Sequence, residues 1–134
     1  MLPWAVLVLD TDESPKGMAT TTERGIKSNE VYYSIAYFFS QYGQQVANYS
    51  SYSSATGTNS LQLWCDATYR GRWGSTWYWL DNLWSSTWGS NLSVGSSKSL
   101  GGQVTLHTHG THLFDYGAGN WVWRSSDDWE NSWD

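Results

Sequence analysis

Apolar and polar side chains alternate most clearly between positions 61 and 69. The apolar positions of this stretch are Leu61, Leu63, Cys65, Ala67 and Tyr69. In an extended chain, successive side chains point to opposite faces of a sheet. The pattern therefore predicts a strand whose apolar face lies in the core and whose other face carries Trp64 and Asp66.

Weaker patterns predict further strands. Residues 31–39 are rich in aromatic and β-branched types, and residues 44–53 alternate weakly. In residues 103–109, two aliphatic side chains would lie on one face and the polar ones on the other. Trp121 and Trp123 would likewise share one face, with the residue between them on the other, and residues 4–9 form a short apolar run. Short strands separated by Gly, Ser and Asn at intervals of roughly ten residues are typical of antiparallel folds. We therefore expect an all-β chain, a single-domain antiparallel β-sandwich or barrel of short strands.

Composition sharpens this expectation. The 134 residues include eleven Trp, nine Tyr and three Phe, and only 14% are charged. Aliphatic residues are scarce, so the core is predicted to be rich in aromatic rings. Met18 is a natural alternative start, so we divide the chain into residues 1–17, an N-terminal extension or edge strand, and residues 18–134. The latter form one β-rich domain that ends in an acidic, Trp-containing C-terminal tail.

Charge excludes some partners. The formal net charge is −5 and the basic residues are scattered, which argues against nucleic acid and against strong attraction to anionic lipid. The single cysteine, Cys65, permits no intrachain disulfide and is predicted to be a buried hydrophobe. The N-terminus lacks a basic segment and a small-residue cleavage site, so there is no clear signal peptide. We nevertheless expect an extracellular or surface-associated protein.

Tryptophan is the strongest functional signal. Eleven indoles exceed what a core of this size needs, so several are predicted to be exposed. Residues 73–77 and 84–88 both match W-[GS]-S-T-W, as two facing strands or two equivalent loops. Even spacing also predicts that Trp73, Trp77 and Trp79 share one face. The candidate stacking residues are Trp73, Trp77, Trp84 and Trp88, and the candidate hydrogen-bonding residues are Asp66, Asp81, Asn82 and Asn91.

The three histidines form an H-x-H-x-x-H run. His107 and His109 would point the same way along a strand, and a turn at Gly110 would let His112 join them around a divalent transition metal. The alternative is a solvent-facing strand of polar residues. Neither G-x-S-x-G nor a phosphate-binding loop occurs, so we expect no enzyme activity and no cofactor beyond such a metal.

Three functions suit these observations. The first is a non-enzymatic, lectin-like binding module that engages carbohydrate or cell-surface ligands through exposed tryptophans. The second is a self-assembling structural subunit of a coat, fibre or virion, suggested by only five charges between positions 31 and 100. The third is a membrane-active pore-forming toxin or bacteriocin that inserts a hairpin formed by residues 91–109. Membrane contact and homo-oligomers or polymers therefore stay open as alternatives to a glycan partner.

Overall fold

The computed structural model describes the backbone of residues 17–23, 26–57 and 61–133, and side chains from residue 29 onward. Every regular element within these ranges is a β-strand. The strands are β1 (Gly17–Glu23), β2 (Ile26–Gln41), β3 (Gln44–Thr56), β4 (Gln62–Trp73), β5 (Thr76–Trp88), β6 (Asn91–Ser99), β7 (Val104–Asp115) and β8 (Trp121–Asn131). The predicted all-β class is confirmed.

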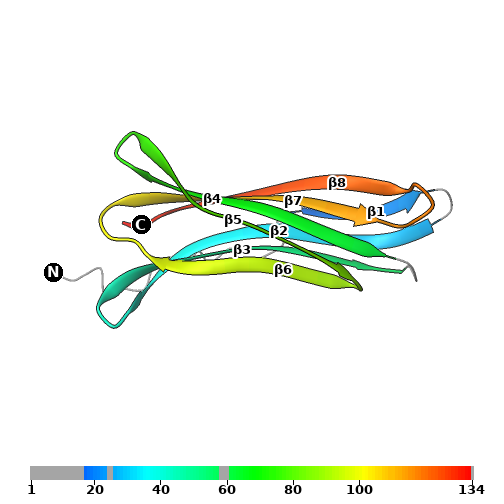
Figure 1. Cartoon of the computed structure of the whole chain (residues 1–134), viewed down its shortest axis with the longest axis horizontal. Helices are drawn as coiled ribbons and strands as arrows, with labels where there is room; N and C mark the ends of the chain where they lie inside the picture. The colour runs from blue at the N-terminus through cyan, green and yellow to red at the C-terminus, as the bar shows by residue number, and fades with distance from the viewer. Residues whose placement is uncertain (1–16, 24–25, 58–60, 134) are drawn as a thin grey trace.

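The strands form two four-stranded sheets that pack face to face (Figure 1). Sheet A has the order β1-β2-β3-β6 and sheet B the order β5-β4-β7-β8, and every neighbouring pair is antiparallel. The chain crosses between sheets from β3 to β4, from β5 to β6 and from β6 to β7. Of the two predicted architectures, the structure is the sandwich and not the closed barrel.

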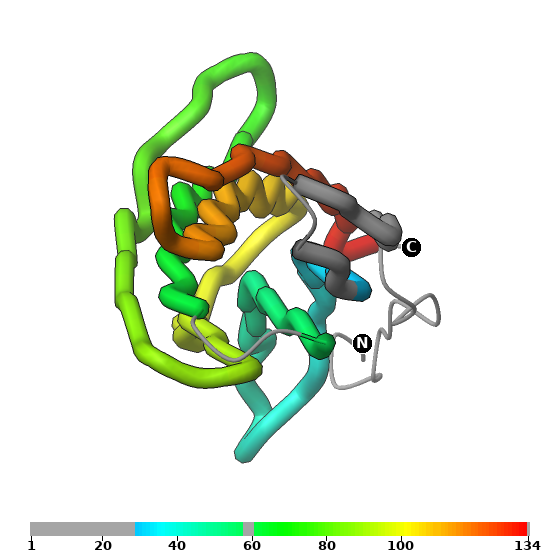
Figure 2. The backbone as a smooth tube through the Cα atoms, turned by 90° about the vertical axis from the view of Figure 1, so that its right-hand side faces the viewer, coloured from blue at the N-terminus to red at the C-terminus, as the bar shows by residue number. Residues whose placement is uncertain are grey.

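Two hairpins project from one end of the sandwich. The β2–β3 turn and the β4–β5 turn leave on opposite sides of the molecule (Figure 2). Tyr42 and Gly43 form the first turn with φ angles of 51° and 75°. A left-handed pair suits a two-residue hairpin turn, because its twist matches that of the two strands.

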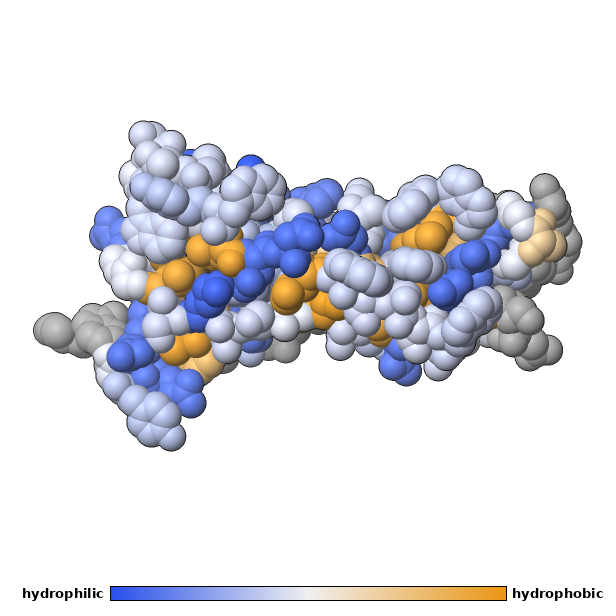
Figure 3. Space-filling view, viewed as in Figure 1, coloured by the Kyte–Doolittle hydropathy of each residue, from blue (hydrophilic) through white to orange (hydrophobic). Residues whose placement is uncertain are grey.

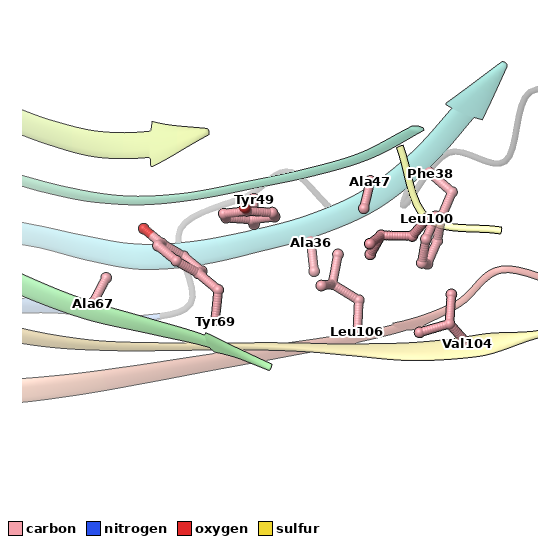
Figure 4. Close-up of a cluster of buried hydrophobic side chains, with 9 residues drawn as sticks. All are labelled: Ala36, Phe38, Ala47, Tyr49, Ala67, Tyr69, Leu100, Val104 and Leu106. Atoms are coloured by element: carbon pink, nitrogen blue, oxygen red, sulfur yellow. The ribbon is translucent and has the colours of Figure 1, made fainter. Parts of the chain in front are cut away.

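The core is rich in aromatic rings, as predicted, because its largest fully buried side chains are Tyr and Phe. The rings of Tyr49 from sheet A and Tyr69 from sheet B lie 4.3 Å apart between the layers (Figure 4). Phe38 and Leu106 pack in the same cluster, and Phe114 lies in a second cluster toward the other end. Along one side of the molecule, hydrophobic residues show as a discontinuous band between the layers (Figure 3). The apolar face predicted for residues 61–69 is buried, including Cys65.

A polar network joins the sheets between these clusters. The hydroxyl of Ser34 lies 2.8 Å from that of Ser51 and 2.7 Å from that of Ser126. His112 continues the chain of contacts, with Nε2 2.8 Å from Ser126 Oγ and Nδ1 2.7 Å from Ser53 Oγ. All five residues are buried, and the network satisfies their polar atoms.

Three expectations need correction or qualification. Residues 91–109 are not a hairpin: β6 pairs with β3 in sheet A, whereas β7 pairs with β4 and β8 in sheet B. The acidic C-terminal segment is not a tail, because most of it is strand β8. The apolar run at residues 4–9 and most of the expected extension lie outside the described residues.

Candidate ligand-binding face

The outer face of sheet B carries eight of the eleven tryptophans. The members of this tryptophan face are Trp64, Trp77, Trp79, Trp84, Trp88, Trp121, Trp123 and Trp129. Seven of them are exposed, from 37% for Trp64 to 73% for Trp88, and Trp77 is half-buried. Sheet A differs sharply, because none of its strands contains a tryptophan.

The register of sheet B fixes which side chains lie side by side. One cross-strand row reads Trp88, Gln62, Asp115, Trp121, and another reads Trp79, Arg70, His107, Trp129. Seven tryptophans therefore stand on the edge strands β5 and β8. Of the eight tryptophans of the face, only Trp64 stands on a central strand.

The central strands place mostly polar side chains between the two tryptophan rows. We call these residues the polar lane: Gln62, Asp66, Thr68, Arg70, Arg72, Thr105, His107, His109, Thr111 and Asp115. Strand geometry makes the lane about 33 Å long, and the whole face about 14 Å wide. Tryptophan rows bordering a hydrogen-bonding lane are the main feature of this surface.

A β-bulge brings the tryptophans of β5 together. Trp77 and Trp79 have odd positions and Trp84 and Trp88 even ones, so a regular strand would send the two pairs to opposite faces. The register shifts where Tyr69 pairs with Asp81 and the next residue pairs with Trp79, which leaves Leu80 unpaired. One extra residue restores a shared outward direction.

The end of the face that lies away from the β2–β3 and β4–β5 turns is mainly aromatic. Trp64 and Trp84 lie nearly parallel, with ring centroids 6.1 Å apart and an interplanar angle of 14°. Trp121 and Trp123 meet edge to face at 6.3 Å. Asp66 accepts a hydrogen bond from Asn82 at 3.3 Å beside these rings. Apolar ring faces and amide and carboxylate groups are thus available together.

The opposite end, which we call the arginine end, combines tryptophans with two cations. The guanidinium carbon of Arg70 lies 4.9 Å from the centre of the Trp77 ring and 5.7 Å from that of Trp79. Arg72 lies 5.4 Å from the same Trp77 ring. Such contacts combine cation–π attraction with packing of the planar guanidinium on the indole.

At the arginine end, hydrogen bonds fix which ring nitrogen of His107 carries the proton. Arg70 donates to His107 Nδ1 at 2.9 Å, so His107 donates from Nε2 to Asp127 at 2.8 Å. Burial lowers the pKa of His107, although its contact with Asp127 opposes the shift. Its imidazole is therefore neutral at pH 7 and stacks on Trp129 at 3.8 Å.

Asp127 serves both histidines. Burial alone would raise its pKa, but hydrogen bonds from His109 and His107, each 2.8 Å long, lower the pKa below its ordinary value. The ionised carboxylate of Asp127 therefore fixes both imidazole rings on the outer face.

Five of the eight predicted ligand-binding residues lie on the tryptophan face. Trp84, Trp88, Asp66 and Asn82 lie toward its aromatic end, whereas Trp77 belongs to the arginine end. The structure does not bring the other three to them: Trp73, Asp81 and Asn91.

These three occupy other surroundings. Trp73 packs against the core and donates to the carbonyl of Gly101 at 2.9 Å. Asp81 points inward, where it accepts a hydrogen bond from Tyr49 and lies 3.7 Å from Lys98 Nζ. Asn91 lies in sheet A. The expectation that Trp73 shares a face with Trp77 and Trp79 was wrong, because a turn intervenes.

The three histidines do not converge. His107 and His109 point the same way, as expected, and lie on the outer face, but β7 continues straight through Gly110. His112 consequently points inward and is fully buried. Within the part of the chain that the structure describes, no group of three His, Cys, Asp or Glu side chains is placed to hold a metal ion.

The W-[GS]-S-T-W repeat has no common structure. The first copy spans the β4–β5 turn, whereas the second lies within β5. The candidate set omitted Trp79 and the tryptophans of β8, although Trp121 and Trp123 already showed the alternation of an exposed face. The pairing of β8 with β7, which brings them to this face, has no local signal in the sequence.

Comparison with family models, curated proteins and solved structures finds no match. Among the described residues, no helix is long and apolar enough to cross a membrane.

Proposed function

We propose that this protein is a non-catalytic carbohydrate-binding module whose ligand lies along the polar lane. The observation that carries the proposal is the pairing of tryptophan rows with a polar lane on one face. The apolar faces of sugar rings stack on indoles, and their hydroxyls need hydrogen-bond partners at the same time. A module of this kind would act at an extracellular or cell-surface glycan.

The lane favours a glycan over a lipid surface. Asp66, Asp115 and Asp127 lie on the face with the tryptophans. Pressing the face onto a bilayer would take these carboxylates out of water without supplying donors, which is costly. Sugar hydroxyls supply those donors. The toxin alternative also loses its inserting hairpin, since residues 91–109 are divided between the two sheets.

The length of the lane favours an oligosaccharide over a single sugar. About 33 Å of strand accommodates several consecutive sugar units, and tryptophans border it at both ends. Contact at the two ends would then act together through one chain, so we expect affinity to rise with chain length.

A double variant, Trp77→Ala with Trp88→Ala, tests the proposal. It removes one indole from each end of the face. We expect at least a tenfold loss of affinity in affinity gels of cellulose derivatives, xylan, mannan and soluble chitin, because buried indoles dominate contact energies. The matched control is Tyr42→Ala with Tyr78→Ala, which removes two exposed aromatic side chains that do not belong to the tryptophan face.

The control double variant should bind like the unmodified protein, and both variants should keep the near-ultraviolet circular dichroism of a folded chain. Full binding by a folded Trp77→Ala, Trp88→Ala protein would contradict the proposal. Absence of binding to any polysaccharide, including arrayed animal glycans, would also reject it.

Self-assembly is the second candidate, and the exposed edge of β5 favours it. This edge strand is 13 residues long and pairs on only one side within sheet B. Long edge strands can pair with another chain. Large particles in light scattering, with the face protected from quenchers, would support assembly instead.

A further inference from the structure

Two arginines of the face, Arg70 and Arg72, form no ion pair with any acidic residue that the structure describes. The ion pairs of the described residues involve Lys98, Arg124 and two histidines, but neither Arg70 nor Arg72. The chain has twelve acidic residues and seven basic ones, so carboxylates are plentiful. On an acidic protein, two neighbouring arginines that pair with no described carboxylate require an explanation.

Both guanidinium groups are held in place by neutral groups. The Trp77 ring lies within 5.4 Å of both, and each group donates one hydrogen bond to a neutral acceptor, His107 Nδ1 for Arg70 and Thr105 Oγ1 for Arg72. A guanidinium has five N–H groups. Most donors are therefore free for a ligand, and the side chains are already ordered, which lowers the entropic cost of binding.

We infer that the ligand is an acidic glycan, mostly of neutral sugars, whose single carboxylate or sulfate group binds Arg70 and Arg72. This inference rests on the proposed function. Arg70 and Arg72 are two positions apart on one strand, so their backbones lie about 6.6 Å from each other on the same face. Arginine matches planar or tetrahedral oxyanions with paired hydrogen bonds. The adjoining Trp77 and Trp79 rings would carry the sugar that bears the acid.

The rest of the lane limits the ligand to few acidic groups. Asp66 and Asp115 lie toward the aromatic end, and Asp127 lies beside the arginine end. A polyanion along the lane would meet these carboxylates and be repelled. The charge distribution therefore orients the glycan, with its acidic unit at Arg70 and Arg72 and its neutral units toward Trp64 and Trp84.

The test compares oligosaccharides that differ only in one acidic group. The probes are lacto-N-neotetraose with and without a terminal sialic acid, xylohexaose with and without one glucuronate branch, and heparin as a polyanion. Calorimetry is applied to the unmodified protein and to Arg70→Gln, Arg72→Gln and Lys98→Gln. The Lys98 variant removes one charge in sheet A and serves as the control.

We expect the acidic member of at least one pair to bind tenfold or more tightly than its neutral member, because hydrogen bonds to charged groups are the stronger kind. Either arginine variant should weaken binding of the acidic member more than binding of the neutral member, and so reduce that ratio to near one. Lys98→Gln should keep the ratio. Heparin should bind more weakly than the monoacidic ligand.

Other outcomes overturn the inference in distinguishable ways. Equal affinity for neutral and acidic members rejects the acidic ligand but leaves carbohydrate binding in place. No binding to any probe or polysaccharide rejects both. Tightest binding to heparin rejects the single acidic group, and arginine-dependent binding to phosphatidylserine vesicles instead of glycans rejects the glycan. If a glutamine variant unfolds, Arg70→Lys and Arg72→Lys replace it, because lysine keeps the charge but lacks the paired N–H donors of a guanidinium. An unchanged ratio of acidic to neutral affinity in both lysine variants would show that paired hydrogen bonds do not recognise the acidic group.

Discussion

His112 and Ser53 join the two sheets through a contact of 2.7 Å between imidazole Nδ1 and the serine hydroxyl. The imidazole is fully buried, and burial, with a smaller effect of His109, lowers its pKa from 6.5 to about 4. His112 is therefore neutral in the folded protein at pH 7. Its ring is part of the network that holds the middle of the sandwich together.

This buried imidazole predicts a loss of stability in acid. Between pH 6.5 and about 4 the unfolded chain binds a proton at His112 and the folded chain does not, so the free energy of unfolding falls as pH falls through this window. The full effect is on the order of 3 kcal/mol. Urea unfolding at pH 7.5 and at pH 4.5 measures it.

The variant His112→Gln isolates this contribution. Other groups titrate in the same window, but the variant lacks only the titration of this ring, so its stability should depend less on pH. An unchanged pH dependence in the variant would show that His112 is not the responsible group.

Gly110 is predicted to tolerate no side chain. An added Cβ would lie 2.8 Å from both Ser34 Oγ and Ser51 Oγ and 2.9 Å from His112 Nε2. Gly110→Ala should therefore destabilise the fold by about 1–3 kcal/mol, the usual cost of overpacking. Gly101→Ala is the matched control, because nothing lies within 4 Å of its Cβ position. Equal unfolding midpoints for the two variants would contradict this account of the network.

Deletion of Leu80 is predicted to be tolerated, although the residue lies inside a strand. It is the extra residue of the bulge, so its removal leaves a regular β5 with Trp79 and Trp84 still on one face. Its half-buried side chain packs on the core, so the loss should cost about 2 kcal/mol or less.

The control for this deletion is removal of Ala67 from regular strand β4. That change shifts the register against both neighbouring strands and should prevent folding. Acrylamide quenching of tryptophan emission is expected to stay unchanged on deletion of Leu80. A collapse of the fold, or protected indoles, would show that the bulge has another role.

Cys65 is predicted to be unreactive in the folded protein. Its thiol is buried, and burial raises its pKa to about 12, so almost no thiolate is present at pH 8. An aromatic disulfide reagent should modify it only after urea unfolds the chain. Rapid stoichiometric modification of the native protein would mean that the sheets separate readily around this residue.

Local alternation predicted the parts of the fold that depend on neighbouring residues. It identified the buried face of β4, and it placed His107 with His109 and Trp121 with Trp123 on shared faces, because side-chain direction in a regular strand follows from position alone. It failed where one residue changes direction, as at Leu80, whose bulge appears only in the pairing with β4. A turn expected at Gly110 does not occur, because that glycine instead makes room for the serines of the opposite sheet.

The sequence predicted which residue types form the candidate site, but not where these residues lie in the fold. Trp77, Trp84 and Trp88 were identified, but the tryptophans of β8 reach the same face through pairing between residues far apart in the sequence. For the same reason Asp81 was assigned to the ligand, whereas it accepts a hydrogen bond from the core residue Tyr49. Sequence alternation cannot reveal which strands become neighbours.

All eight tryptophans of the face project from sheet B, and no strand of sheet A contains one. Under the proposed function, a molecule with one such face would have a valence of one. A single copy would then hold one glycan chain and not bridge two, so it would coat a polysaccharide or a cell without cross-linking it. Agglutination would then require two copies joined through another surface.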